Sequence, residues 1–249
     1  MVLTRAFTLT FLRGKITSSY HFFMPNLKII FKINKTLDLR TGLLFRNIKA
    51  GGVDFRKLGL LAPHPDLKIY RHLTRSILTT HINRYYQRYG KKLEKTRLNF
   101  ARTWKNASGT FLSLTKTIFG AGFPPPATYT CYLSIWNCNP RDIRHKSFQI
   151  FYRHKDFLEI MTHEMLHFAF YAYVYERFPR LKRLKHAKSL WEISEAFNTV
   201  ILNSPEWRKK LHTKLQPPYP ELRGLVRTMR KQWEQSKHIE HLLQTILTK

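Results

Sequence analysis

One group of residues in the sequence has the types and spacing needed for chemistry: His163, Glu164 and His167, in the pattern HExxH. Residues i and i+4 share one face of a helix, so both imidazoles can reach a single zinc ion. Glu164 is rotated by about 100° from His163, where a carboxylate can activate a zinc-bound water without binding the metal itself. We therefore expect His163 and His167 to bind zinc and Glu164 to act as general base.

Catalytic zinc also needs a third protein ligand and an open position for water. Phe170 and Tyr173 stand where a metzincin would carry Gly and His, which excludes that extended motif. Three candidates for the third ligand remain: His186 in a basic segment, and Glu192 and Glu195 in SLWEISEAFN.

The helix that must carry HExxH is expected to begin after Asp156 and to end before Pro179. Glu159 stands three residues after Asp156, which predicts a capping box with Asp in place of Ser or Thr. The apolar residues of this helix are spread around its whole circumference, a pattern typical of a helix buried on every side. Two strands, Thr128–Trp136 and Ser147–Tyr152, precede it and are expected to pair antiparallel.

The two candidate glutamates lie on a second helix, expected over 189–203. Both point away from its apolar stripe, which is typical of a solvated face. Trp191 and Asn198, however, flank the side that carries Glu195 and supply an aromatic wall and a hydrogen-bonding amide. The apolar stripe consists of Leu190, Ile193, Phe197, Val200 and Ile201.

The rest of the chain predicts further elements around this core. We expect a strand over Leu27–Asn34, a turn at Gly51-Gly52, a long basic helix from about His72 to Trp104, and a final helix over Glu221–Lys249. The fold class is therefore α+β. We divide the chain into a basic extension (1–23), a basic N-terminal part (24–122), a catalytic core (123–216) and a C-terminal helix packing on the core (217–249).

This arrangement resembles the gluzincins, whose zinc ligands are the HExxH pair and a Glu on a later helix, and most closely the short minigluzincins. The likeness covers about residues 128–203: HEMLH at 163–167, the strands before it, and WEISEAFNTVILN at 191–203. It implies a zincin-like fold of a small sheet, a backing helix, the HExxH helix and a glutamate helix. The Asn-Glu pair of thermolysin-type members is absent, because Trp191 precedes Glu192 and Ser194 precedes Glu195.

The resemblance implies a zinc metallopeptidase that hydrolyses peptide bonds in a peptide or protein substrate. The Ser-Glu-Ala setting is similar to the ligand position of short gluzincins, so we favour Glu195 over Glu192. A further donor usually stabilises the oxyanion in such reactions. The candidates are Tyr219, His212 and Tyr175.

Two other interpretations stay open. One is a protease resembling the DNA-associated SprT-like enzymes, with His186 as the third ligand. The other is a non-catalytic basic protein that binds nucleic acid. The formal charge of +29 favours an anionic partner, and only four carboxylates precede residue 142. A basic helix with interleaved tyrosines can bind single strands by stacking, but a buried aromatic side with a solvated basic side explains it as well.

Composition also predicts the cellular compartment of the protein. With Cys131 and Cys138 as the only cysteines, reduced thiols in an intracellular compartment are expected. No apolar run approaches the ~18 residues that a membrane span requires. We expect a cytoplasmic protein, or one of the mitochondrial matrix if residues 1–23, which lack carboxylates, form a presequence.

Overall fold

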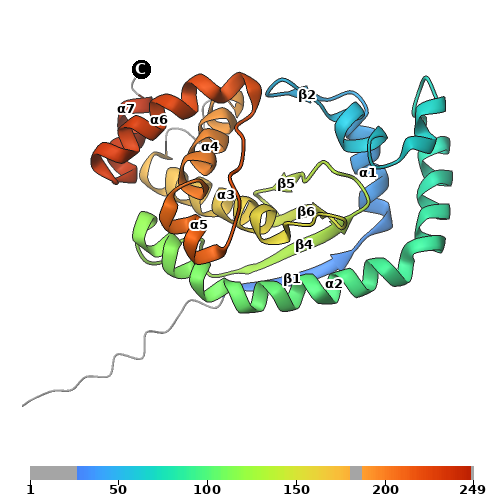
Figure 1. The fold of residues 1–249 in the computed structure, drawn as a ribbon, viewed down its shortest axis with the longest axis horizontal. Helices are drawn as coiled ribbons and strands as arrows, with labels where there is room; N and C mark the ends of the chain where they lie inside the picture. Colours follow the sequence, from blue (N-terminus) through green and yellow to red (C-terminus); the bar gives the residue numbers. More distant parts are fainter. Residues whose placement is uncertain (1–26, 180–186, 248–249) are drawn as a thin grey trace, which may run out of the picture.

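The computed structural model describes residues 27–179 and 187–247. The protein is 64% helical with a small mixed sheet and long helices, so the expected α+β fold class is confirmed. Figure 1 shows the sheet in the middle of the molecule with helices around it. In chain order the elements are β1 (Lys28–Ile33), α1 (Lys35–Phe45), β2 (Lys49–Ala50), β3 (Val53–Asp54), the π-helical turn η1 (Arg56–Leu61), the 3-10 turn η2 (Pro65–Ile69), α2 (Arg75–Phe119), β4 (Thr128–Ser134), β5 (Arg141–Asp142), β6 (Ser147–Phe151), α3 (Phe157–Arg177), α4 (Ala187–Leu202), α5 (Pro205–Leu211), the 3-10 turn η4 (Pro220–Leu222), α6 (Arg223–Ser236) and α7 (Ile239–Leu247).

The main sheet has the strand order β1-β4-β6-β5. β4 and β6 pair in parallel, so the expected antiparallel pairing of these two strands is wrong. Residues 135–146 are long enough to carry the chain back to the start of the sheet, as a parallel connection requires. The antiparallel partner of β6 is instead the short β5, which forms within the turn-rich segment that follows β4.

The first strand joins the N-terminal part of the chain to this sheet. β1 falls within the expected strand Leu27–Asn34 and pairs in parallel with β4, Lys28 opposite Thr128. The sheet therefore contains strands from both sides of the expected boundary between residues 122 and 123. The turn at Gly51-Gly52 is also present, between β2 and β3, which pair antiparallel.

The long helix α2 supports the sheet from one side and curves along it (Figure 1). The sequence predicts its start closely, and Thr74 caps it by accepting a hydrogen bond from the backbone N–H of Ile77 at 3.3 Å. Its predicted end at Trp104 is wrong, because the helix continues to Phe119 and stops at Gly120, whose φ is 82°. Further apolar residues at helical spacing, among them the buried Phe111, continue the buried face beyond Trp104.

The helix α3, which carries HExxH, begins after Asp156 and is buried around most of its circumference, both as expected. The expected capping box is wrong, because the Asp156 side chain makes no capping hydrogen bond. The Nζ of Lys214 lies 3.1 Å from Oδ1 of Asp156, and the backbone N–H of Lys214 donates to the carboxylate of Glu159. Both carboxylates that could cap the helix are thus turned toward a loop that follows α5.

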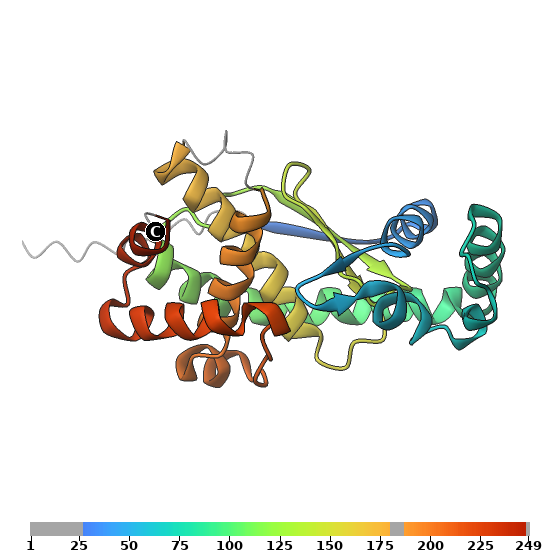
Figure 2. The ribbon, with the colours of Figure 1, turned by 90° about the horizontal axis from the view of Figure 1, so that it is seen from above.

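The C-terminal segment forms two helices, so the expected single helix Glu221–Lys249 is wrong. α6 ends at Ser236 and is followed by Lys237, whose φ of 54° is left-handed and whose backbone N–H donates to the carbonyl of Trp233. The break lets both helices bury apolar residues: α6 packs on α4 through Trp233, and Leu242 of α7 is fully buried. α6 lies beside α4, and α7 packs on α6 (Figure 2).

In the part of the chain that the structure describes, no helix has both the length and the apolar character needed to cross a membrane. Residues 1–23 and His186 lie outside the described residues.

Candidate metal centre

The HExxH residues lie on the buried helix α3, which faces α4. The Nε2 atoms of His163 and His167 are 3.0 Å apart, so the helical spacing brings both imidazoles to one point. The side chain of His167 is fully buried, whereas that of His163 is 18% exposed. The centre is therefore reached from solvent on the His163 side.

The helix α4 adds Glu195 to this pair. Its Oε2 lies 3.2 Å from Nε2 of His163, and its Oε1 lies 3.4 Å from Nε2 of His167. The two helices are tied together at this level, because the side-chain amide of Asn198 donates to the backbone carbonyl of His163 at 2.9 Å. Three potential ligand side chains from two packed helices thus converge at one place.

The structure separates the two candidate glutamates. Glu195 is buried, contrary to the solvated face that the helix pattern suggests, whereas Glu192 is partly exposed and does not join the group formed with the histidines. The reason is that the side of α4 that carries Glu195 packs against α3, where it contacts His163 and His167, and against Arg141 of β5. His186, the third candidate, lies beyond the described residues.

A hydroxyl orients the buried imidazole. Nδ1 of His167 lies 2.5 Å from Oγ of Ser194, the residue that precedes Glu195. Metal-binding histidines usually hold their second ring nitrogen by such a hydrogen bond, which fixes the tautomer and the ring orientation. The Ser-Glu dipeptide of α4 therefore supplies one potential ligand and the support of another.

Arg141 is a site residue that the sequence analysis missed. It comes from β5 at the edge of the sheet, and its guanidinium lies 2.6 Å from Oε1 of Glu195 and 3.5 Å from Oε2 of Glu164. Its side chain is only 13% exposed. Nothing in the spacing connects it with HExxH, since only the antiparallel pairing of β5 with β6 brings it to the centre. A buried guanidinium requires a carboxylate partner, and here it has two.

Burial and charge set the protonation of the centre. Burial lowers the pKa of His167 well below its ordinary value, and the positive charge of Arg141 lowers it further. His167 is therefore neutral at pH 7, the form that binds a metal ion. Burial raises the pKa of Glu164, and the charge of Arg141 opposes that rise. Arg141 thus favours the ionised form that a general base needs.

The three candidates for an oxyanion donor lie in different places. The ring of Tyr219 lies 5.6 Å from that of Trp191 on α4, and burial followed by the charges of Glu195 and Glu164 raises the pKa of Tyr219. Tyr175 lies further along α3, with its ring 5.8 Å from that of Tyr171. His212 ends α5 in a left-handed conformation. Of the three, Tyr219 is the one whose charge environment includes both glutamates of the centre.

The basic helix α2 has the two sides that the sequence suggests. Two of its tyrosines turn inward: the hydroxyl of Tyr86 donates to Asp38 at 2.7 Å, and that of Tyr85 pairs with the hydroxyl of Tyr152 at 2.7 Å. The exposed side carries the charge, in Arg75, Arg84, Arg88, Lys91, Lys92 and Lys95. Binding of nucleic acid by this face stays a prediction.

Both cysteines, Cys131 and Cys138, are buried and form no disulfide, in line with the reduced thiols expected.

Comparisons with known protein families, with curated proteins and with solved structures found no match.

Proposed function

We propose that the protein is a zinc-dependent metallopeptidase of zincin-like type, which hydrolyses peptide bonds with Glu164 as general base. One observation carries this proposal: the ligand atoms of His163, His167 and Glu195 converge at one largely buried place between two packed helices. Glu164 follows the first of these ligands directly in the chain and is itself buried.

The three side chains fit zinc. Two imidazoles, which bind zinc in their neutral form, and one carboxylate make up a donor set that catalytic zinc uses together with a water molecule. Oε2 of Glu195 is buried and, among the described residues, has no hydrogen bond of acceptable geometry although Nε2 of His163 lies 3.2 Å away. Atoms that lie close together without forming a directed hydrogen bond are what a shared metal ion requires of its ligands.

Each residue of the proposed active site then has a role in the reaction. Zinc bound here would lower the pKa of a water molecule and polarise the carbonyl of the scissile bond. Glu164 accepts the proton of the attacking water and delivers it to the leaving amine. Arg141 favours the ionised form of Glu164, and Ser194 holds His167 in its binding tautomer. Tyr219 would donate a hydrogen bond to the developing oxyanion.

Metal content and peptide cleavage test the proposal together. Purified wild type should hold zinc and cleave an unstructured peptide mixture, with fragments identified by mass spectrometry. Glu164→Gln has nearly the same shape, so it should keep zinc and lose at least about a hundredfold in kcat. Glu195→Ala should lose zinc, whereas the matched Glu192→Ala on the same helix should keep it.

The same series separates the alternatives. Zinc retained in Glu195→Ala but lost in His186→Ala would point to the ligand set of the SprT-like interpretation. Wild type that takes up no zinc even when zinc is supplied would refute both zinc-peptidase interpretations and leave the non-catalytic one.

A further inference from the structure

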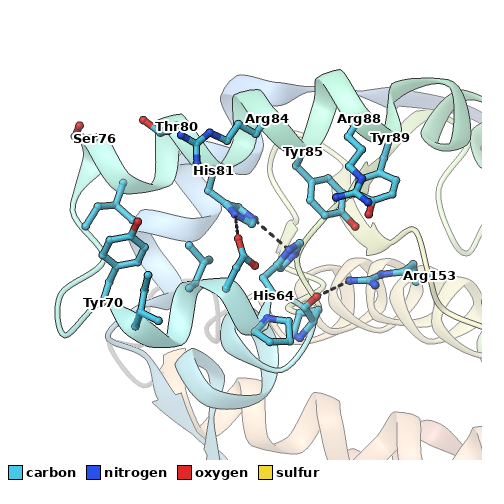
Figure 3. A pocket seen from close by; sticks show the side chains of 16 residues that line it. His64, Tyr70, Ser76, Thr80, His81, Arg84, Tyr85, Arg88, Tyr89 and Arg153 are labelled. Atoms are coloured by element: carbon cyan, nitrogen blue, oxygen red, sulfur yellow. Dashed lines mark hydrogen bonds and ion pairs between the residues drawn. The ribbon is translucent and has the colours of Figure 1, made fainter.

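A second histidine pair lies in a cavity away from HExxH. The cavity has a volume of about 750 Å³ and is formed by η2, the first turns of α2 and the segment after β6. Figure 3 shows His81, from α2, directed toward His64, with a dashed line between the two rings. Figure 1 places this part of α2 at the opposite end of the sheet from α4.

The hydrogen bonds of His64 determine which of its nitrogens carries the proton. Nε2 of His64 lies 2.8 Å from the backbone carbonyl of Ile135. A carbonyl only accepts, so Nε2 carries the hydrogen and donates it. His64 is 2% exposed, and a neutral His64 therefore presents the lone pair of Nδ1 on its other side.

His81 is held in the same way by a carboxylate. Its Nδ1 lies 2.9 Å from Oδ2 of Asp66, and an ionised carboxylate also only accepts. The other nitrogen, Nε2 of His81, lies 3.1 Å from Nδ1 of His64. In the neutral form of both rings with these tautomers, two lone pairs lie 3.1 Å apart with no proton between them. A metal ion at the usual Zn–N distance of about 2.0–2.1 Å from each nitrogen would lie to one side of the line that joins them and would remove their repulsion.

The geometry repeats that of the HExxH pair. There the two facing nitrogens are 3.0 Å apart and a hydroxyl holds the far nitrogen of His167; here they are 3.1 Å apart and both far nitrogens are held by acceptors. Aromatic packing fixes the rings, since Trp136 lies 4.7 Å from the His64 ring and stacks on His81 at 5.7 Å. The two rings are therefore held in place with both nitrogens within reach of one ion.

We infer that Nδ1 of His64 and Nε2 of His81 bind a second divalent transition-metal ion of the zinc class, with Asp66 positioning His81. Imidazole nitrogen is a ligand that zinc, copper and nickel share. The cavity leaves room for water on the remaining coordination positions. Because Arg84, Arg88 and Arg153 also line the cavity, their positive charge makes this site weaker than the HExxH centre.

Metal stoichiometry tests the site independently of peptidase activity. The full chain is stripped with a chelator, dialysed against buffered Zn²⁺, and analysed for bound metal. Wild type should hold two ions per chain, His81→Gln one, and the matched control His72→Gln, an exposed histidine just before α2, two. His163→Ala in the first centre should hold one, and His163→Ala combined with His81→Gln none. Asp66→Asn should weaken the second ion about tenfold, as expected of a residue that orients a ligand.

The outcomes decide the two sites separately. Loss of one ion in His81→Gln supports the second site whatever happens in His163→Ala. Equal metal in wild type and in His81→Gln, with unchanged circular dichroism, would overturn it. In that case an ordinary hydrogen bond between the two rings accounts for their distance.

Discussion

The guanidinium of Arg141 lies 2.6 Å from Oε1 of Glu195, and both side chains are almost wholly buried. This ion pair links the edge of the sheet to the helix α4 at the centre where the two histidines converge. A second nitrogen of Arg141 lies 3.5 Å from Glu164, so one cation faces two buried carboxylates. Burial lowers the pKa of Arg141, but the charges of Glu164 and Glu195 outweigh it and raise that pKa, so Arg141 stays charged at every working pH.

Removing this charge should change the pH dependence of catalysis. Arg141 lowers the pKa of Glu164, which burial raises. In Arg141→Met the pKa of Glu164 rises further, so the protonated, inactive form persists to higher pH. The acid limb of the kcat/KM profile should move to higher pH, and Arg141→Lys, which keeps the charge, should move it less. A limb that does not shift in Arg141→Met would contradict the role given to Arg141.

The same substitution should lower stability. Arg141→Met leaves two buried carboxylates without their cation, and breaking a buried ion pair on one side costs about 3–5 kcal/mol. Urea unfolding of the metal-free protein measures this directly, and it shows whether the variant is folded under the conditions of the rate measurements.

Tyr219 should act in the chemical step and not in metal binding. Tyr219→Phe removes only the hydroxyl, so zinc content should be unchanged. The loss of one oxyanion donor should lower kcat about 10²–10³-fold. Tyr175→Phe serves as the matched control and should retain activity. An equal effect of the two substitutions would argue against Tyr219 as the donor.

Gly51 supports Tyr219 from the turn between β2 and β3. Its φ is +61°, and a Cβ at this position would lie 2.7 Å from Cδ1 of Tyr219. Gly51→Ala should therefore cost about 1–3 kcal/mol from backbone strain alone. It should also displace the tyrosine and reduce activity. In contrast, Gly109 within α2 has nothing within 4 Å, and Gly109→Ala should stabilise the protein by about 0.5–1 kcal/mol. Urea unfolding of both variants checks the opposite signs.

Asp38 should make stability depend on pH. Its carboxylate is buried between α1 and β4, accepts a hydrogen bond from the hydroxyl of Ser134 at 2.6 Å, and has a pKa raised by burial to about 6. Between pH 4 and pH 6 the folded state then binds more protons than the unfolded state, so stability falls as the pH rises. The two-unit difference corresponds to about 3 kcal/mol.

Asp38→Asn has no titrating group at this position. Wild type should therefore lose up to about 3 kcal/mol of stability relative to Asp38→Asn between pH 4 and pH 7. Urea unfolding of the two proteins at several pH values measures the difference. A difference that does not change with pH would show that the carboxyl titrates alike in the folded and unfolded states.

The sequence predicts those parts of the molecule that depend on neighbours along the chain. The spacing of His163 and His167 requires a common helix face, and the apolar residues around them indicate the burial that α3 shows. β1 and the start of α2 follow from alternation and from periodicity in the same way. The capping box predicted at Asp156 does not form. The Asp156 carboxylate instead binds Lys214, a cation more than fifty residues away in the chain, which no local pattern indicates.

Only the tertiary structure decides which side chains from other elements join the HExxH pair. Glu192 and Glu195 have similar local settings, and the packing of α4 on α3 and α6 alone determines that Glu195 meets the histidines. The parallel pairing of β4 with β6 leaves the edge of the sheet to β5 and thereby brings in Arg141. Helical periodicity acts over a few residues and can be read from a sequence, whereas these contacts depend on how distant segments share one core.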